Sequence, residues 1–359
     1  MVNRGFQEDR LIQALRMIAP GTLLRDAIDN IVRSRHGALL VFSDEELVRP
    51  MISGGIDINV ALSPMILYEL CKMDGAILLD ADGSRILHAN VQLMPDASIS
   101  SQETGTRHRT AERVAKQIDT LAISISAARD VVTVYVGEIR HLVDPIRTIL
   151  DKADQALHTL EKFRTRWNQV STSLSLLEFQ DSATMHDVLR VLQRAEMMLV
   201  LVQLIESYVI ELGTEGRLVQ LQLEDMLVGV RDDRMAVLAD YLPDATPARI
   251  ESYGASPLGP VISDDLLSLA YVAEMLGFGP DVALDKHVRP RGFRLLHKVP
   301  RLNEWVVDAV VGHFGDINHL IEAPLDELAA VPGVGFPRAR EIQEGLNRTR
   351  ESALVERRG

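Results

Sequence analysis

The feature that most constrains the fold is a change in hydrophobic periodicity near Asp144-Pro145. Before this pair, short apolar runs typical of strands alternate with stretches of helical spacing, whereas after it only helical spacing recurs. Aspartate favours the N-cap of a helix and proline its first position, so the pair itself predicts a helix start. The sequence therefore predicts an α/β part followed by parts that are entirely helical.

Residues 1–140 are predicted to form a mixed α/β sheet domain. The apolar runs expected as strands are residues 37–42, 76–79, 86–93, 121–125 and 131–136. Helical spacing marks residues 7–18, 23–33, 63–73 and 106–118. A mixed order of strands and helices is typical of one sheet covered by helices.

Residues 141–287 are predicted to form an all-α bundle that serves as a spine. A helix is expected to begin near residue 146, and amphipathic stretches are expected at residues 219–230 and 264–276. Successive helices of this kind are expected to pack antiparallel. A further helix is expected between the one that begins near residue 146 and the stretch at residues 219–230. Its apolar heptad seam is formed by Val188, Val191, Ala195, Met198, Val202, Ile205 and Val209.

Residues 288–359 are predicted to contain only short helices, among them a helix-hairpin-helix. Two glycines in the turn allow a tight bend and let backbone N–H groups approach a phosphate, and the next helix offers its positive end. Ala339 is small enough for the two helices to approach each other, and Ile342 continues the apolar face. A hairpin used only for packing is the alternative. The predicted DNA contacts are Gly333, Val334, Gly335, Arg338 and Arg340.

A second copy of this hairpin is expected at residues 296–307. There Pro300 matches Pro332, but Arg301 and Asn303 replace the glycines. This copy is interpreted either as a structural partner of the first or as a phosphate contact through Arg301. Because phosphate contacts carry no base sequence, we expect binding that selects branched or damaged DNA by its structure.

The distribution of charge also points to the C-terminal part as the DNA contact. The chain has a formal net charge of −13, which argues against a surface that binds nucleic acid throughout. Residues 288–359 carry eleven Lys and Arg against ten Asp and Glu, a balance of +1, which leaves −14 for the rest.

The sequence predicts a cytoplasmic protein without a membrane partner. Cys71 is the only cysteine, so no internal disulfide forms and a reducing compartment is expected. The N-terminus lacks the apolar run of a secretory signal. The most apolar stretch, residues 197–205, is shorter than the roughly 20 residues of a membrane helix.

Two short motifs in the first domain carry the expected chemistry. Asp74-Gly75-Ala76 lies between an expected helix and an expected strand, where a carboxylate can hold a metal ion and a glycine lets backbone approach a ligand. Asp-Gly is also a common turn, so this motif alone is weak. The second motif, residues 105–110, places two arginines and a histidine at the start of a helix.

The charges of this second motif oppose the helix dipole unless an anion binds there. A triphosphate would supply that anion, held by arginine forks, free N–H groups and threonine hydroxyls. The alternative interpretation is a solvated basic turn paired with Glu103 and Glu112.

Both motifs, together with the helical spine and the terminal helix-hairpin-helix, resemble the bacterial DNA-integrity scanning protein family over essentially the whole chain. The resemblance implies a diadenylate cyclase that condenses two ATP molecules into cyclic di-AMP with release of two pyrophosphates, using Mg²⁺ or Mn²⁺. It further implies that two catalytic domains face each other, each presenting one ATP, and that the chain assembles as a homo-octamer of two head-to-head rings. It places the protein in the bacterial cytoplasm, associated with DNA.

The match of motifs implies the roles of individual residues. Asp74 would bind the metal and activate the 3′-hydroxyl, and the catalytic set would be Asp74, Arg107, His108 and Arg109. Ala127 and Ala128 stand where more basic character is expected, so Arg129 is the candidate for a γ-phosphate contact. The implied ATP contacts are Asp74, Gly75, Ala76, Leu93, Thr106, Arg107, His108, Thr110 and Ser126.

Two other function classes stay open from the residues alone. One is a DNA-binding scaffold that senses nucleotide without catalysis, and the other is a structural repair adaptor. The presence of Asp74 and of the complete Arg107-His108-Arg109 run argues against both, because a sensor has no need of a metal-binding acid.

Overall fold

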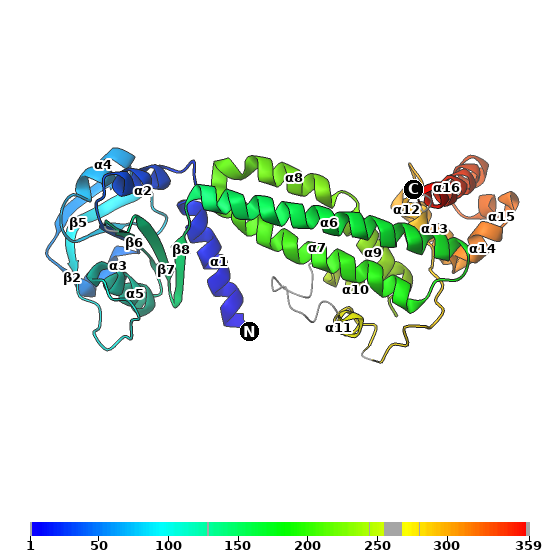
Figure 1. The fold of residues 1–359 in the computed structure, drawn as a ribbon, viewed down its shortest axis with the longest axis horizontal. Helices are drawn as coiled ribbons and strands as arrows, with labels where there is room; N and C mark the ends of the chain where they lie inside the picture. Colours follow the sequence, from blue (N-terminus) through cyan, green and yellow to red (C-terminus); the bar gives the residue numbers. More distant parts are fainter. Residues whose placement is uncertain (1, 128, 244, 255–267, 280, 357–359) are drawn as a thin grey trace. The chain divides into compact units, whose positions relative to one another are not determined.

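The computed structural model describes residues 2–127, 129–243, 245–254, 268–279 and 281–356 (Figure 1). The chain divides into two compact units. The first unit consists of Met1–Asp154 with Glu206–Gln220, and the second of Gln155–Ile205 with Leu221–Gly359.

The first unit is built on an eight-stranded mixed sheet. The strand order is β2-β5-β4-β1-β6-β7-β8, and β3 also pairs with β5. Only β1 and β4 run parallel, and the other pairs are antiparallel. The strands are β1 (Ala38–Phe42), β2 (Ile52–Ser53), β3 (Ile56–Ala61), β4 (Ala76–Leu79), β5 (Arg85–Leu93), β6 (Leu121–Ser126), β7 (Val131–Val136) and β8 (Ile139–Val143).

The central strands are buried on both sides, because helices cover both faces of this sheet (Figure 1). On one face, α1 (Val2–Met17), α2 (Leu23–Arg33) and α4 (Pro64–Leu70) pack on Leu40, Ile77 and Ile123. On the other face, α3 (Glu45–Val48) and α5 (Thr106–Ile118) pack on Leu39, Val41, Leu78 and Ala122. The alternation of side chains along each strand separates these two cores.

The strands β2, β3 and β8 were not predicted from the sequence. β3 pairs only with β5 and is largely exposed, and β8 lies at the edge of the sheet next to β7. Half-exposed edge strands of this kind bury too few apolar side chains to show a clear apolar run. The sheet therefore continues past the expected boundary at residue 140, since β8 ends at Val143.

Long helices form the expected helical spine. They are α6 (Ile146–Phe179) and α7 (Met185–Leu212), followed by the turn η2 (Gly213–Gly216), α8 (Arg217–Leu227) and α9 (Val230–Tyr241). All residues of the heptad seam except Val209 are buried. The stretch expected at residues 219–230 ends before Gly229, whose φ of 74° is left-handed and precedes α9.

The range Met185–Tyr241 contains a window long and apolar enough to cross a membrane, judged by length and composition. This finding differs from the prediction that the most apolar stretch, residues 197–205, is too short to cross a membrane. One window of this kind is weak support for a membrane span, because the core helix of a soluble protein passes the same test. The seam side chains of α7 are buried inside the protein, as in such a core helix.

The C-terminal region contains several short helices and one long helix. α16 (Gly335–Glu356) has 22 residues, so the expectation of short helices only is wrong. Its polar composition hides the apolar stripe of Ala339, Ile342 and Leu346, which is buried in the C-terminal core. The shorter helices are α10 (Pro247–Ser252), α11 (Leu269–Met275), α12 (Phe293–His297), α13 (Glu304–Phe314), α14 (Ile317–Glu322) and α15 (Leu325–Ala330). The first part of the helix expected at residues 264–276 lies outside the described residues.

A buried ionic network joins α12 to α6 and α9 within the second unit. Arg294 Nη1 donates to Glu178 Oε2 at 2.6 Å, and Arg294 Nε lies 3.1 Å from Asp233 Oδ1. Asp240 accepts hydrogen bonds from the backbone N–H groups of Gly292, Phe293 and Arg294, so it caps the start of α12. The network therefore holds the start of the C-terminal helices on the bundle.

We predict that Arg294→Met lowers the free energy of unfolding of the second unit by about 3–5 kcal/mol. The substitution removes the cation that directly contacts the buried carboxylates of Glu178 and Asp233. Urea unfolding followed by tryptophan fluorescence reports this unit, because both tryptophans, Trp167 and Trp305, belong to it.

Arg289→Ala is the matched control, because Arg289 pairs with Asp181 at the surface, where a salt bridge contributes less than about 1 kcal/mol. Equal losses of unfolding free energy in Arg294→Met and Arg289→Ala would contradict the conclusion that the buried ion pairs stabilise the unit more than the exposed one does.

Candidate active site

The Asp74-Gly75-Ala76 motif forms the bend that leads from α4 into β4. Gly75 has a φ of +95°, and a Cβ at this position would lie 2.9 Å from the carbonyl oxygen of Val91 on β5. No other residue fits this backbone without strain. The Ala76 side chain is buried, whereas Asp74 is exposed. The bend therefore presents the Asp74 carboxylate at the edge of the sheet.

The parallel pairing of β1 and β4 brings a second segment to the same place. The register pairs Leu40 with Ile77, which places Gly37 and Asp74 at the same end of adjacent strands. The antiparallel pairing of β1 with β6 matches Ala38 to Ile125, so Ser126 ends β6 at this same end. Asp74 and Ser126, which are far apart in sequence, thus lie at one end of the sheet.

Arg107 reaches this end from the first turn of α5. A Cβ on Gly37 would lie 2.5 Å from Arg107 Nη1, so the glycine makes room for the guanidinium. Burial raises the pKa of the Cys71 thiol to about 12, and the positive charge of Arg107 acts against that rise. By its contact with Gly37 and the register of β1 with β4, Arg107 lies beside the Asp74 bend.

The start of α5 has the properties of an anion site. Gly105 at the N-cap provides no side-chain cap, and the first turn contains no acidic residue. In the described part of the chain, the backbone N–H groups of Thr106, Arg107 and His108 have no hydrogen-bond partner. Free N–H groups and the positive helix end favour a bound anion such as phosphate. Thr106 is exposed, and Thr110 is half-buried.

His108 is oriented by residues that the sequence did not indicate. Its Nδ1 lies 3.0 Å from the hydroxyl of Tyr135 on β7, and that hydroxyl donates to Glu103 Oε1 at 2.8 Å. Arg140 on β8 also donates to Glu103. Because the tyrosine proton goes to Glu103, Nδ1 of His108 is the donor in its bond to Tyr135 and Nε2 is left for a ligand. Burial lowers the pKa of His108, and this effect outweighs the charge of Glu103.

The interpretation of this turn as basic residues paired with Glu103 and Glu112 does not match the contacts. The Glu103 carboxylate binds Arg140 and Tyr135, and that of Glu112 binds Ser101 and Lys116. Arg107 has no hydrogen bond or ion pair within the described ranges. The positive charge of Arg107 therefore remains available to a ligand.

Arg109 and Leu93 have mainly structural contacts. Arg109 Nε donates to the carbonyl of Glu103 at 3.2 Å, so this side chain holds the loop before α5. Leu93 and Ala76 belong to the apolar core beneath α5. Their side chains shape the floor below the site.

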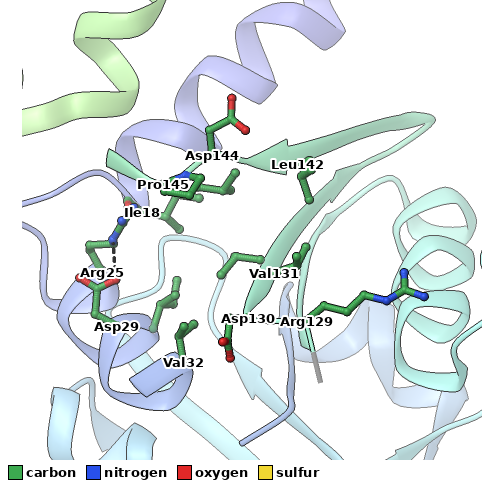
Figure 2. Close-up of a pocket in the computed structure, with 13 residues that line it drawn as sticks. Ile18, Arg25, Asp29, Val32, Arg129, Asp130, Val131, Leu142, Asp144 and Pro145 are labelled. Atoms are coloured by element: carbon green, nitrogen blue, oxygen red, sulfur yellow. Dashed lines mark hydrogen bonds and ion pairs between the residues drawn. The ribbon is translucent and has the colours of Figure 1, made fainter. Parts of the chain in front are cut away.

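A cavity of about 390 Å³ lies between α2 and the β7–β8 edge of the same unit, and Figure 2 shows its lining. Arg25 and Asp29 form an ion pair at 2.9 Å on the α2 side. Asp130 and Arg129 come from the turn before β7, and Arg129 extends away from that ion pair. Neither Asp74 nor Arg107 lines this cavity, but Val131, which does, pairs with Ser126 at the end of the sheet where the motifs meet.

The predicted DNA contacts surround the turn before α16. Gly333 and Gly335 have φ values of +80° and +60°, as a glycine-dependent turn requires. The side chain of Val334 is buried and its N–H donates to the Val331 carbonyl, so this N–H is not available to a phosphate. Arg340 is exposed. In the part of the chain that the structure covers, the N–H group of Gly335 has no partner.

Trp305 is a neighbour of this turn that the sequence did not reveal. A Cβ on Gly333 would lie 2.1 Å from Cζ3 of Trp305. Arg338 stacks over the same ring with 5.4 Å to its centroid, and its Nη1 donates to the Gly333 carbonyl at 2.6 Å. Arg338 therefore stabilises the turn. Arg301 in the first copy has a φ of 66°, in place of a glycine.

Comparison with known proteins agrees with this arrangement. Residues 25–139 match the family model described as DisA bacterial checkpoint controller nucleotide-binding, and residues 143–284 match that described as the DisA linker region. The chain is 44% identical over 352 residues to the DNA integrity scanning protein DisA of Clostridium perfringens, covering 98% of this chain and 99% of that protein. It is 45% identical over 357 residues to DisA of Acidothermus cellulolyticus, covering 99% and 97%.

The DNA integrity scanning protein DisA of Frankia alni gives 44% identity over 352 residues, covering 98% of each chain. Identity at this level extends over the nucleotide-binding part, the helical linker and the C-terminal helices. The chain therefore belongs to the DisA family of DNA integrity scanning proteins and is a diadenylate cyclase, a nucleotidyltransferase.

Proposed function

We propose that Asp74, Arg107 and His108 form one ATP half-site of this diadenylate cyclase. The observation that supports it is that Arg107 lies against Gly37 beside the Asp74 bend, at one end of the β1/β4 pair, and that His108 is the next residue of α5. The free N–H groups at the start of α5 and the guanidinium of Arg107 would hold the phosphates. The negative charge of a bound triphosphate would favour the protonated imidazole of His108, whose Nε2–H would then donate to a phosphate oxygen.

The product has two phosphodiester bonds, so two such half-sites must meet. We expect each half-site to present one ATP, whose 3′-hydroxyl attacks the α-phosphate of the other ATP with loss of pyrophosphate. A single chain provides one Asp74 and one Arg107, so we propose that a second copy supplies the facing half-site. The homo-octamer implied by the family resemblance would bring such pairs together.

The donors around Asp74 fit Mg²⁺ or Mn²⁺ as part of a metal–ATP complex. Among the described residues, no group of three His, Cys, Asp or Glu is arranged to hold a metal ion. Mg²⁺ is commonly bound by one or two carboxylates together with substrate phosphates, so a single exposed Asp74 is sufficient with ATP. When bound, the metal would neutralise phosphate charge and polarise the reacting groups.

We predict that Asp74→Asn lowers cyclic di-AMP formation about a hundredfold or more, because the carboxylate that binds the metal is lost. Chromatography of the products from ATP and Mn²⁺ measures the rate. Asp82→Asn is the control, since Asp82 accepts from the N–H of Ser84 in a turn. Near-normal turnover in Asp74→Asn would favour the nucleotide-sensing scaffold instead.

We predict that Arg107→Ala weakens ATP binding about ten- to hundredfold, as expected for loss of a hydrogen bond to a charged group. Arg107→Lys should recover part of the loss, because lysine keeps the charge without the planar fork. Isothermal titration with a non-hydrolysable ATP analogue gives the affinities. Unchanged affinity in Arg107→Ala would support a solvated basic turn.

We further propose that the C-terminal helices bind the backbone of branched or damaged DNA and that this binding regulates the cyclase. The free N–H group at Gly335 and the exposed Arg340 on the first turns of α16 are the proposed phosphate contacts. Binding to DNA would place this soluble protein in the bacterial cytoplasm, in association with DNA.

We predict that Arg340→Ala weakens binding to branched DNA uniformly across sequences and reduces the slope of its salt dependence by about 1. Turnover of ATP without DNA should persist. Gel shifts at several salt concentrations, with turnover on the same preparation, measure both. Arg190→Ala, which changes an exposed arginine of α7, is the control. Equal DNA affinity in wild type and Arg340→Ala would place the contact elsewhere.

A further inference from the structure

A polar cavity lies in the second unit, beside the hairpin copy at residues 296–307, whose Lys298 and Pro300 line it. It has a volume of about 400 Å³ and lies between α6, the segment that follows α12, and α16. Its polar lining consists of Thr172, Ser175, Lys298, Arg348, Thr349 and Ser352.

The spacing of these residues explains why their side chains meet. Thr172 and Ser175 are three residues apart and lie on one face of α6. Arg348, Thr349 and Ser352 likewise share one face of α16. Two helices therefore turn hydroxyl groups toward the same space.

Close packing of the chain holds the walls of this cavity in place. A Cβ on Gly345 of α16 would lie only 2.5 Å from Cγ1 of Val299. Val299 is buried and directly follows Lys298, so this contact sets how near Lys298 comes to α16. Pro300 and Ala353 complete the lining without charge.

The lining is positive, although the chain as a whole is strongly negative. Lys298 and Arg348 contribute two cations, and none of the lining residues is acidic. Lys298 Nζ donates to Ser175 Oγ at 3.1 Å and lies 4.0 Å from Asp233 Oδ1, which lines a neighbouring cavity. Within the described residues, Arg348 has no hydrogen bond or ion pair.

Two cations in a lining without acidic residues match the chemistry of a phosphate group. Lysine and arginine supply charge-assisted hydrogen bonds to its oxygens, and the Ser352 hydroxyl can donate a further one. Ser175 and Thr349 donate to the backbone carbonyls of Ser171 and Gly345. Two neighbouring cations favour an anion with more than one negative charge over a single carboxylate. A cation would be repelled.

We propose that this cavity is a phosphate-binding site, separate from the ATP half-site and from the Gly333–Gly335 turn. Arg348 is thirteen residues beyond Gly335 on α16, which corresponds to about 20 Å along the helix. The phosphate comes either from a free ion such as pyrophosphate, which the cyclase releases, or from a DNA backbone that extends beyond the hairpin. The proposal does not depend on the hairpin binding DNA.

The test follows acylation of Lys298 by mass spectrometry in the full-length protein, with inorganic pyrophosphate or a DNA duplex as the probe. This readout is local, so pyrophosphate at the ATP half-site does not affect it. A bound phosphate should slow the modification of Lys298 severalfold. Arg348→Ala should weaken binding of the protecting probe about tenfold, and Ser352→Ala, which removes one hydroxyl of the lining, should weaken it less.

Arg350→Ala is the matched control, because Arg350 is also an exposed residue of α16 but does not line this cavity. It should leave protection of Lys298 unchanged. Urea unfolding by tryptophan fluorescence should be the same for both arginine variants, since both side chains are exposed.

The two probes distinguish the sources of phosphate. If a free phosphate is the ligand, pyrophosphate protects Lys298 and Arg348→Ala leaves DNA affinity unchanged. If the DNA backbone is the ligand, the duplex protects Lys298 and Arg348→Ala weakens DNA binding and lowers its salt slope by about 1. Absence of protection by both probes would overturn the proposal, whatever the result for Arg340→Ala.

Discussion

The parallel pairing of β1 with β4 is the constraint on which the active site depends. It aligns Gly37 with Asp74 at one end of the sheet, and β6 adds Ser126 beside them. Among the described strands, β1 and β4 are the only parallel pair, and parallel strands begin at the same end. A slip of one residue in this register would turn the buried side chains to the opposite face. The two cores therefore fix the register, and with it the position of Asp74.

Glycines let other groups approach this end of the sheet. Gly75 allows β5 to pass within contact distance, and Gly37 leaves room for the guanidinium of Arg107. The start of α5 then concentrates unpaired N–H groups beside an arginine without an acidic partner. Such an arrangement is electrostatically unfavourable until an anion binds, which is the property required of a triphosphate site. The His108–Tyr135–Glu103 chain orients the imidazole without neutralising Arg107.

A different constraint operates in the second unit. There the side chains of Arg234 and Arg294 are almost fully buried, and each meets a carboxylate from a separate helix. Asp240 adds hydrogen bonds to the first N–H groups of α12, so the C-terminal helices are held by polar contacts as well as by apolar packing. Removing one partner of such a pair costs more than the pair itself contributes. The same packing positions Lys298 at the polar cavity beside α16.

Hydrophobic periodicity along the sequence was sufficient to predict the central strands, α2, α5 and the buried seam of α7. These elements bury whole apolar faces, and burial of that kind leaves a regular pattern in the sequence. Edge strands such as β8 and the polar helix α16 leave a weak pattern in the sequence. β8 was therefore not predicted, and the length of α16 was underestimated. The motifs around Asp74 and Arg107 were also visible in sequence, because they use residue types with special backbone or charge properties.

Only the tertiary structure decided which distant residues meet. Glu178 and Arg294 are separated by 116 residues, and Tyr135 by 27 residues from His108. A charged residue in a helix is expected to face solvent, and nothing local shows that another helix will supply its partner. The position of Arg107 against Gly37 and the absence of acidic residues in the cavity beside α16 likewise depend on packing between elements. Periodicity records how one element is buried, whereas contacts between elements follow from the whole fold.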